Sequence, residues 1–296
     1  MASEVDESHV SWRHVRVDQK KAIARAARKL DRPGFRPLLS WGASAGLSVK
    51  NRNLTRVRHR AGHWEHHLGR NFAVAAPSVL LRGPSEWMAD FEWMWLHDYV
   101  PKTGDVVVDV GAGIGTEVYP LSKLVGETGV VIAIEAFPPV ADCLAWTVRA
   151  NGLTNVRLHN VAASDKAGSV KLSDSVDAHE HNSILANDLY LPPDQTCSVP
   201  ADTLDSLLAD VPHIAWLKMN IEGAERPALL GAKEVLGRTD HLVVSCHDFI
   251  ADVGGPDELR TAEFVTNLLQ QHGFKVFRRP EQPWWRRDEI WGDRAS

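Results

Sequence analysis

The sequence predicts an α/β fold built on a doubly wound, mostly parallel sheet. From residue 105 onward, apolar runs of strand length alternate with segments whose apolar residues recur at helical spacing. The first two runs, 105–110 and 130–135, are largely apolar, as is typical of strands that are buried on both faces. A glycine-rich turn at 111–115 joins the first run to the helix that follows. Together these observations predict a Rossmann-like sheet of seven strands, the last two of which pair as an antiparallel hairpin.

The expected elements can be placed in order along this domain. A helix follows the glycine turn and extends to about residue 124, and a second helix ends at the Asn151-Gly152 stop signal before a strand at 156–162. Polar residues and prolines at 169–195 interrupt the alternation and predict an inserted hairpin and loop, a feature that often covers a site. The second half is expected to contain helix 201–210, strand 214–221, helix 225–237, strand 241–248, helix 258–273, and strands 274–279 and 288–293.

Composition narrows the class of protein. With 296 residues, 44% of them hydrophobic, the chain is long enough for one large domain and an extension. The cysteines, Cys143, Cys197 and Cys246, are scattered and form no C-x-x-C pair, so the sequence predicts neither a disulfide framework nor a zinc site. The first ten residues are polar and acidic, and no apolar run approaches the roughly 20 residues of a membrane span. We therefore expect a soluble, cytoplasmic protein without a membrane span.

The front of the chain is basic and lacks the strand-helix alternation. Residues 1–70 hold 15 Lys and Arg against 6 Asp and Glu, whereas the remainder holds 18 against 32. We expect a basic helical extension at 1–75, with a solvated amphipathic helix around 19–30, and the α/β domain at 76–296. Such a segment is also compatible with an anionic substrate, a nucleic acid, or the acidic body of its own or a neighbouring subunit, as in a homodimer.

A ligand site is indicated where the first strand ends. The loop D-V-G-A-G-I-G-T-E places Asp109 ahead of Gly111, Gly113 and Gly115, and the glycines allow a tight turn and close approach of a ligand to the backbone. Glu135 ends the next strand, where a carboxylate can accept hydrogen bonds from both ribose hydroxyls of an adenosine. NAD and S-adenosylmethionine both fit this geometry. The G-x-G-x-G spacing differs from the dinucleotide pattern G-x-G-x-x-G, which favours S-adenosylmethionine.

Further segments sharpen this prediction. PKTGDVVVDVGAGIGTE at 101–117, IEAFPP at 134–139, NVRLHNVAASDKAG at 155–168, DTLDSL at 202–207 and LKMNIEGAE at 217–225 together resemble the FkbM-type methyltransferases. These are class I S-adenosylmethionine-dependent enzymes that mostly methylate hydroxyl oxygens of small molecules and sugars. The resemblance runs from about residue 92 to residue 248. It implies S-adenosylmethionine as the cofactor and a hydroxylated small molecule, such as a sugar or a secondary metabolite, as the acceptor.

The resemblance also implies roles for residues around the cofactor. The glycine loop wraps the methionine end, Glu135 holds the ribose, and Phe137 flanks the adenine, although an aromatic side chain there can equally belong to the core. The full set of implied contacts comprises Asp109, Gly111, Ala112, Gly113, Gly115, Thr116, Glu117, Glu135, Ala136, Phe137, Val161, Ala162 and Asn220.

Candidate catalytic residues follow strands four and five. Methyl transfer from a sulfonium is an in-line displacement, so the enzyme must align the acceptor and remove its proton. His247 is a candidate base because histidine titrates near neutral pH, and the alternative is a histidine that closes the strand end. Glu222 is either the base or an acid that caps the helix after Gly223. Lys218 either contacts substrate or extends along the apolar strand to the sheet edge, and Asn220 lies between these residues.

Asn220 is a departure from the family pattern. The family usually has Lys-x-Asp-x-Glu-Gly after strand four, whereas this chain has an asparagine at the aspartate position. Asparagine cannot act as a base and is a weaker ligand for a hard cation, so we expect no bound metal. Glu222 and Asp248 remain an alternative pair for Mg²⁺, and a catalytically silent cofactor-binding domain remains a further alternative.

A pair of histidines and a pair of tryptophans are further candidates for contact with the acceptor. His179 and His181, in the predicted insertion, either face the acceptor or are solvated. Trp284 and Trp285 lie in a turn, where an exposed pair would stack on a sugar or another flat acceptor. The tryptophans at helical spacing near the domain start are expected in the core: Trp87, Trp93 and Trp95.

Two other functions compete with methyl transfer to oxygen. A nicotinamide-dependent oxidoreductase would need a proton relay such as Tyr-x-x-x-Lys, which the three tyrosines do not provide. A nucleic-acid-binding or nucleic-acid-modifying protein could use the basic first segment. Base methylation typically requires an N/D-P-P-Y/F element after strand four, where this chain has N-I-E-G at 220–223. We therefore expect an oxygen acceptor and regard nucleic acid as the less favoured partner.

Overall fold

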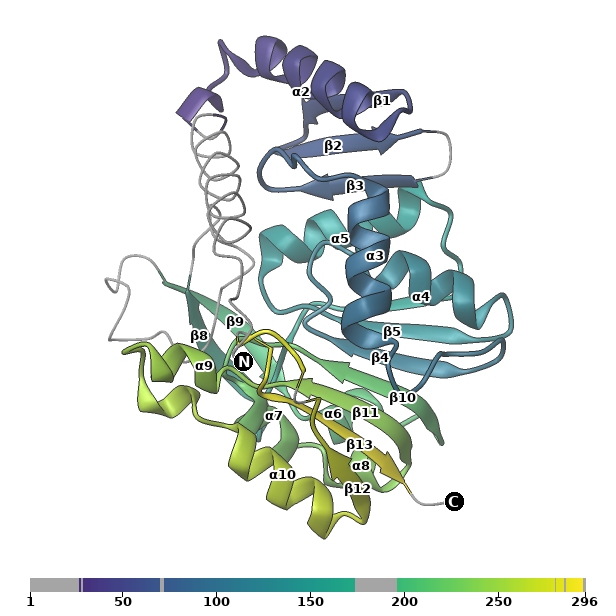
Figure 1. Cartoon of the computed structure of the whole chain (residues 1–296), viewed down its shortest axis with the longest axis vertical. Coiled ribbons are helices and arrows are strands. Elements are labelled where there is room, and N and C mark those ends of the chain that lie inside the picture. Colours follow the sequence, from purple (N-terminus) through teal and green to yellow (C-terminus); the bar gives the residue numbers. More distant parts are fainter. Residues whose placement is uncertain are drawn as a thin grey trace, which may run out of the picture.

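The computed structural model describes residues 27, 29–69, 72–173, 196–279, 281–284 and 286–294. A seven-stranded sheet lies at its centre, in the order β12-β13-β11-β10-β4-β5-β6 (Figure 1). The strands are β4 (Val106–Val110), β5 (Val130–Ile134), β6 (Val156–His159), β10 (Ile214–Met219), β11 (Thr239–Ser245), β12 (Phe274–Phe277) and β13 (Glu289–Arg294).

The strand pairing confirms the predicted doubly wound sheet. Strands β11, β10, β4, β5 and β6 are parallel, and β13 runs antiparallel to both β11 and β12. The chain enters the sheet at β4, continues outward to β6, and returns to the other side of β4 with β10. The carboxyl ends of β4 and β10 therefore border the point at which the strand order reverses, where open α/β sheets bind ligands.

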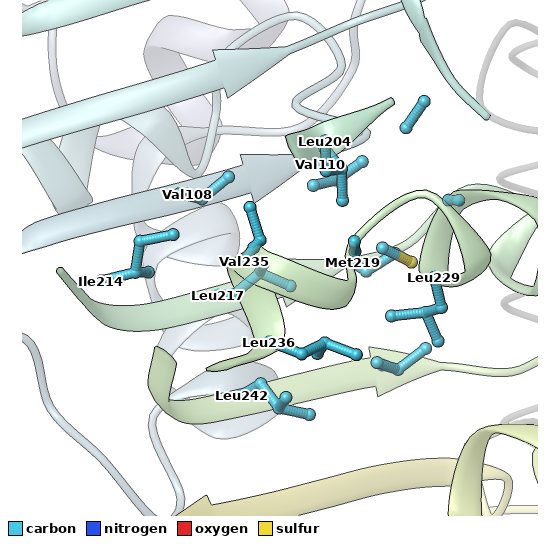
Figure 2. Packing of buried hydrophobic residues seen from close by; sticks show 14 of the residues in the cluster. Val108, Val110, Leu204, Ile214, Leu217, Met219, Leu229, Val235, Leu236 and Leu242 are labelled. Carbon is cyan, nitrogen blue, oxygen red and sulfur yellow. The ribbon is translucent and has the colours of Figure 1, made fainter. Parts of the chain in front are cut away.

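Helices cover both faces of this sheet because neighbouring residues of each strand point to opposite sides. One face packs on α3 (Pro84–Trp95), α4 (Val118–Val125) and α5 (Pro138–Ala150). The other face packs on α6 (Leu204–Leu207), α7 (Glu225–Leu230), α8 (Lys233–Gly237) and α10 (Ala262–Gln271). Figure 2 shows this second core, in which Val108, Leu217 and Leu242 meet Val235 and Leu236 of α8. Between β11 and α10 lie the short helices α9 (Asp248–Asp252) and η3 (Asp257–Leu259).

Two predicted elements are divided in the structure. The helix expected at 225–237 is interrupted at Gly231, where a Cβ atom would lie 2.1 Å from the carbonyl oxygen of Ser164, so the chain touches another backbone there. The strand expected at 156–162 ends at His159, and the next residues form β7 (Ala162–Ala163) in a separate sheet with β8 (Gly168–Ser173) and β9 (Thr196–Asp202). Strands β8 and β9 pair antiparallel, so the predicted hairpin is found with different bounds, since its second strand begins only after the predicted segment 169–195. Residues 174–195, with His179 and His181, lie outside the described residues.

The expectation of a purely helical extension at 1–75 is wrong for its last third. Helix α2 (Arg36–Asn51) is followed by a three-stranded antiparallel sheet of β1 (Thr55–Arg60), β2 (His63–Leu68) and β3 (Phe72–Ala76). Arg60 pairs with His63 across a two-residue turn in which Ala61 and Gly62 both have positive φ, the geometry that a tight hairpin requires.

This small sheet docks on the main domain through β3. The amide of Ala75 donates to Thr147 Oγ1 at 3.1 Å, and Asn151 Nδ2 donates to the carbonyl of Ala73 at 2.6 Å. Figure 1 shows β1–β3 between α2 and α5. The division of the chain at residue 75 stays a prediction. Among the described residues, none of the helices is long and apolar enough to cross a membrane.

Candidate functional site

The glycine loop after β4 is fixed on two sides and open on the third. A Cβ atom on Gly111 would lie 2.0 Å from the carbonyl oxygen of Asn220, and one on Gly115 would lie 2.8 Å from Leu144 Cδ1 of α5. Gly113 has a φ of 55° and faces open space, since a Cβ atom there would meet nothing within 4 Å. Its neighbours Ala112 and Thr116 are buried and half-buried in the same turn. The loop therefore lies against both β10 and α5 and offers the backbone at Gly113 to a ligand.

Glu135 lies where the sequence predicted, beside this loop. Its two carboxylate oxygens accept hydrogen bonds from the amides of Gly113 and Phe137, each at 2.9 Å. Burial raises the pKa of Glu135, and these amide donors oppose that shift. The carboxylate is thus held next to the open side of Gly113, with Ala136 half-buried alongside it.

The residues implied around an adenine are mostly packed in the interior. Phe137 is 2% exposed and belongs to a core cluster with Val140, Cys143 and Ala162. Val161 and Ala162 are also buried. Burial supports the alternative of Phe137 as a core aromatic, and contact of these residues with an adenine stays a prediction.

Lys218 forms a buried ionic cluster beneath the glycine loop. Its ammonium group lies 2.9 Å from Asp109 Oδ1, 2.8 Å from Glu117 Oε2 and 3.0 Å from the carbonyl oxygen of Gly111. Trp95 completes the cluster, because its ring lies under the ammonium at 5.2 Å and its Nε1 donates to Glu117 at 2.8 Å. Burial lowers the pKa of Lys218, but the two carboxylates outweigh burial and raise it above its ordinary value.

These contacts correct the interpretation of Lys218. Its side chain is only 2% exposed, so the predicted extension to the sheet edge is wrong. The three N–H groups of the ammonium are matched by three acceptors within the protein, which leaves none for a substrate. The geometry favours a positioning role for Lys218 and Glu117 under the loop over a catalytic one.

A second ionic cluster lies at the ends of β10 and β11. His247 Nδ1 is 3.1 Å from Glu225 Oε1, and His247 Nε2 is 3.5 Å from Glu222 Oε2. Burial lowers the pKa of His247, but hydrogen bonds and charges from Glu222 and Glu225 raise it to about 10. The expectation that His247 titrates near neutral pH is therefore wrong, since both ring nitrogens face carboxylates and the imidazolium form is favoured.

Glu222 differs from the other members of this cluster. Its side chain is 18% exposed, whereas those of His247 and Glu225 are almost fully buried. Its φ of 55° is unusual for a residue with a side chain, and such backbone strain is concentrated at functional sites. Helix α7 begins at Glu225, whose Oε1 accepts from the amide of Gly223 at 3.0 Å, so Glu225 rather than Glu222 is the acid in its first turn.

Glu225 and Thr261 are site residues that sequence reasoning did not identify. Thr261 Oγ1 donates to Glu225 Oε2 at 3.1 Å and so orients the carboxylate that holds His247. The sequence E-G-A-E at 222–225 could have indicated Glu225, because the first turn of a helix that follows a strand lies close to the strand ends. Thr261 lies 36 residues farther along the chain, and its sequence surroundings gave no signal.

Metal ligation by Glu222 and Asp248 is not supported by the contacts of Asp248. Its Oδ1 accepts from the amides of Thr261 and Ala262, at 2.9 and 3.0 Å, and thereby caps α10. Within the described part of the chain, the group of three ligand atoms close enough for a metal ion is Asp98, His241 and Asp293. His241 lies near the beginning of β11, at the opposite end of that strand from His247.

Asn220 and Asp109 each present a buried oxygen toward the loop without a donor. Asn220 Oδ1 and Asp109 Oδ2 have no hydrogen-bond partner among the described residues. Burial raises the pKa of Asp109 to about 7, although Lys218 opposes that shift. Unsatisfied buried acceptors are costly, so Asn220 Oδ1, in a half-buried residue beside the loop, favours a ligand with an N–H or O–H donor, whereas Asp109 is completely buried.

The burial of the tryptophans agrees only in part with the prediction. Trp87 and Trp95 pack in the core as expected, whereas Trp93 is 45% exposed. The ring of Trp93 lies 5.6 Å from the guanidinium of Arg286, a contact that the helical spacing could not indicate. Trp284 is 57% exposed and meets Phe249 edge-on at 5.7 Å, and Phe249 lies 5.7 Å from the ring of His247. Trp285 is outside the described residues.

Comparison with known proteins places these features in a family. Residues 109–276 match the model of the methyltransferase FkbM domain, which is more than half of the chain. Over 57 residues the chain is 37% identical to protein-L-isoaspartate O-methyltransferase of Methanococcus aeolicus, a match that spans 19% of the chain and 26% of that relative. The matched segment thus spans about a quarter of the length of this curated relative.

Solved structures are similar at low sequence identity. The crystal structure of methyltransferase FkbM from Methylobacillus flagellatus KT is 16% identical with a TM-score of 0.48, covering 72% of this chain and 51% of that one. A SAM-dependent methyltransferase from Aquifex aeolicus is 21% identical with a TM-score of 0.40, covering 71% of this chain and 87% of its own.

Proposed function

This chain belongs to the FkbM family of S-adenosylmethionine-dependent class I methyltransferases, and from that premise we propose that it methylates a hydroxyl oxygen of a small molecule. The acceptor class we favour is a sugar or a natural product with a flat or sugar-like face. The observation that carries this proposal is the partly exposed carboxylate of Glu222, held at the ends of β10 and β11 by an imidazolium.

The residues around the glycine loop fit the cofactor. Asn220 Oδ1 is an unpartnered acceptor that suits the ammonium of its methionine part, and Glu135 suits its ribose hydroxyls. The open backbone at Gly113 leaves room beside these groups. When bound, S-adenosylmethionine supplies an electrophilic methyl group on a sulfonium. The protein then has to place the acceptor oxygen and remove its proton.

We assign proton removal to Glu222. Its carboxylate accepts the proton of the acceptor hydroxyl, and His247, kept protonated by Glu222 and Glu225, fixes the position of that carboxylate. Glu225 is fixed in turn by Thr261 and by the amide of Gly223. A positioned base of this kind typically contributes about 10²–10⁴-fold to a rate. His247 is thus a positioning residue in this proposal rather than the base.

Two aromatic rings beside this cluster, the exposed Trp284 and the half-buried Phe249, support the acceptor class. Trp284 and Phe249 form a surface that begins at the ring of His247. Apolar faces of sugars and flat rings pack on exposed tryptophan, and polar hydroxyls of the same molecule would lie toward Glu222. We further propose that transfer needs no Mg²⁺, since Asp248 is engaged in capping α10, and that the protein works in the cytoplasm, in keeping with its free cysteines.

Calorimetric titration and steady-state kinetics test this proposal together. We expect S-adenosylhomocysteine to bind with micromolar affinity, NAD not to bind, and Glu135→Ala to abolish binding. On a hydroxylated acceptor found by screening with and without Mg²⁺, Glu222→Gln should lower kcat about 10²–10³-fold while the affinity for S-adenosylhomocysteine stays within about twofold. A Glu222→Gln enzyme with unchanged kcat would remove Glu222 as the base. Absence of S-adenosylhomocysteine binding would contradict the proposed site as a whole.

A further inference from the structure

Helix α2 is firmly attached to the small sheet by one face. Ala43 and Leu47 are buried against Val57 and Trp64. The hydroxyl of Ser44 accepts from the amide of Val57 at 2.9 Å, and that of Ser48 accepts from the amide of Thr55 at 2.8 Å. The orientation of the helix about its own axis is therefore fixed, and its other face is turned permanently outward.

That outward face is apolar along its whole length. No charged residue occurs between Arg36 and Lys50. The exposed side chains in and beside the helix include Phe35 at 51%, Leu38 at 62%, Trp41 at 72%, Val49 at 81% and Leu54 at 81%. Leu38, Trp41, Ala45 and Val49 recur at helical spacing, and Gly42 and Gly46 between them have nothing within 4 Å of a Cβ position. A contiguous apolar face of this kind is typical of an interaction surface, whereas single exposed apolar side chains are common on any protein.

Basic residues surround this face. Residues 29–60 contain eight Lys and Arg and one acidic residue, Asp31. Lys29 and Arg32 before the helix and Arg52 after it are exposed, whereas Lys50 at its end is paired with Glu86 at 2.5 Å. Figure 1 shows α2 lying across one end of the molecule, with β1–β3 between it and the main domain. A flat surface can therefore approach the helix along its length.

We propose that α2 docks in the plane of an anionic lipid bilayer, with Leu38, Trp41 and Val49 inserted at the headgroup boundary. Amphipathic helices with Trp and Leu on one face and flanking Lys and Arg bind such surfaces by apolar burial together with attraction to anionic lipids. Charge decides against a second copy as the occupant. Both ends of α2 are basic, so pairing two copies in either direction would bring cations together, whereas an anionic bilayer complements both ends.

Vesicle co-sedimentation of the full chain tests the proposal. The protein should pellet with vesicles of phosphatidylcholine containing about one third phosphatidylglycerol and much less with phosphatidylcholine alone, and added salt should weaken binding. The double variant Leu38→Gln/Trp41→Gln should bind at least about tenfold more weakly, because both apolar anchors are lost. Val253→Gln, a change at a side chain 71% exposed just after α9, is the matched control and should bind like the parent.

Unchanged S-adenosylhomocysteine binding by the double variant would show that it is folded and that weaker pelleting arises at α2. The proposal is overturned if the parent stays in the supernatant with both lipid mixtures, or if the double variant pellets as well as the parent. A dimer in light scattering that the double variant abolishes, without vesicle binding, would assign this face to a second copy instead. Salt-sensitive RNA binding without vesicle binding would likewise overturn it and assign the basic residues to nucleic acid.

Discussion

Two ionic clusters lie at the carboxyl end of the central sheet, and each places one cation between two carboxylates. Under the glycine loop, Lys218 lies between Asp109 and Glu117. Beyond the ends of β10 and β11, His247 lies between Glu222 and Glu225. Their compositions are similar, and each contains one partly exposed carboxylate, Glu117 at 22% and Glu222 at 18%.

The two clusters differ in the contacts of these carboxylates and in the backbone that carries them. Lys218 and Asp109 are almost completely buried, and the ammonium has all three protons directed to the protein. In the His247 cluster one carboxylate, that of Glu222, is partly exposed and its backbone is strained. Both oxygens of Glu117 are engaged within the protein, by Lys218 and by Trp95 Nε1, which suits support of the loop, whereas Glu222 lies on a strained backbone at the strand ends, the position to which we assign proton removal.

Removal of Lys218 should have the largest effect and tests whether the Lys218 cluster is structural. Lys218→Met leaves Asp109 and Glu117 without their cation, and breaking a buried ion pair in this way costs about 3–5 kcal/mol. We expect that loss in the free energy of unfolding, measured in urea, together with loss of S-adenosylhomocysteine binding. The control Lys233→Met, at an exposed lysine, should change the unfolding free energy by less than about 0.5 kcal/mol. A stable Lys218→Met protein that still binds the ligand would show that the cluster does not support the loop.

The two clusters also show what the sequence could predict. Alternating apolar runs indicated the strands, and the glycine spacing with Glu135 located the loop, because both depend on local patterns. The pairing of Lys218 with Glu117 and Trp95 could not be predicted, since it depends on how α3 packs over β10. The protonation of His247 was predicted wrongly for the same reason, because Glu225 reaches it only in the folded chain.

The three-stranded sheet near the amino end was missed for a different reason. Strands β1 and β2 carry many Arg and His residues, whereas β3 is short and apolar and is stabilised by docking on α5. Polar and charged strands of this kind give a weak periodic signal. The hairpin turn at Ala61-Gly62 was the local cue that could have indicated it.

Removal of His247 should have a smaller effect, with a defined pH dependence. Its folded pKa of about 10 exceeds the ordinary value of 6.5, so its stabilisation is complete below about pH 6.5 and is lost as the pH rises toward 10. We expect His247→Gln to lower the unfolding free energy by about 2–3 kcal/mol at pH 6, with the deficit shrinking steadily toward pH 10. The comparison requires urea unfolding of both proteins across this range. His213→Gln, at an exposed pair with Asp240, is the control and should differ little from the parent throughout. A deficit that grows with pH would contradict an imidazolium in this cluster.

The smallest effects should come from the two glycines that separate packing from ligand contact within the loop. Gly111→Ala places a methyl group 2.0 Å from the carbonyl of Asn220, so the loop must shift away from β10, and we expect a loss of about 2 kcal/mol in unfolding free energy. Gly113→Ala meets no atom of the protein and costs only the strain of a positive φ, about 1 kcal/mol. Its methyl group instead enters the open space beside Glu135. For Gly113→Ala, the loss in binding free energy for S-adenosylhomocysteine should therefore exceed the loss in unfolding free energy. If Gly113→Ala binds the ligand as tightly as the parent, the open side of the loop is not the cofactor site. If Gly111→Ala is as stable as the parent, the loop is not held against β10, and this result would also contradict the supporting role assigned to Lys218.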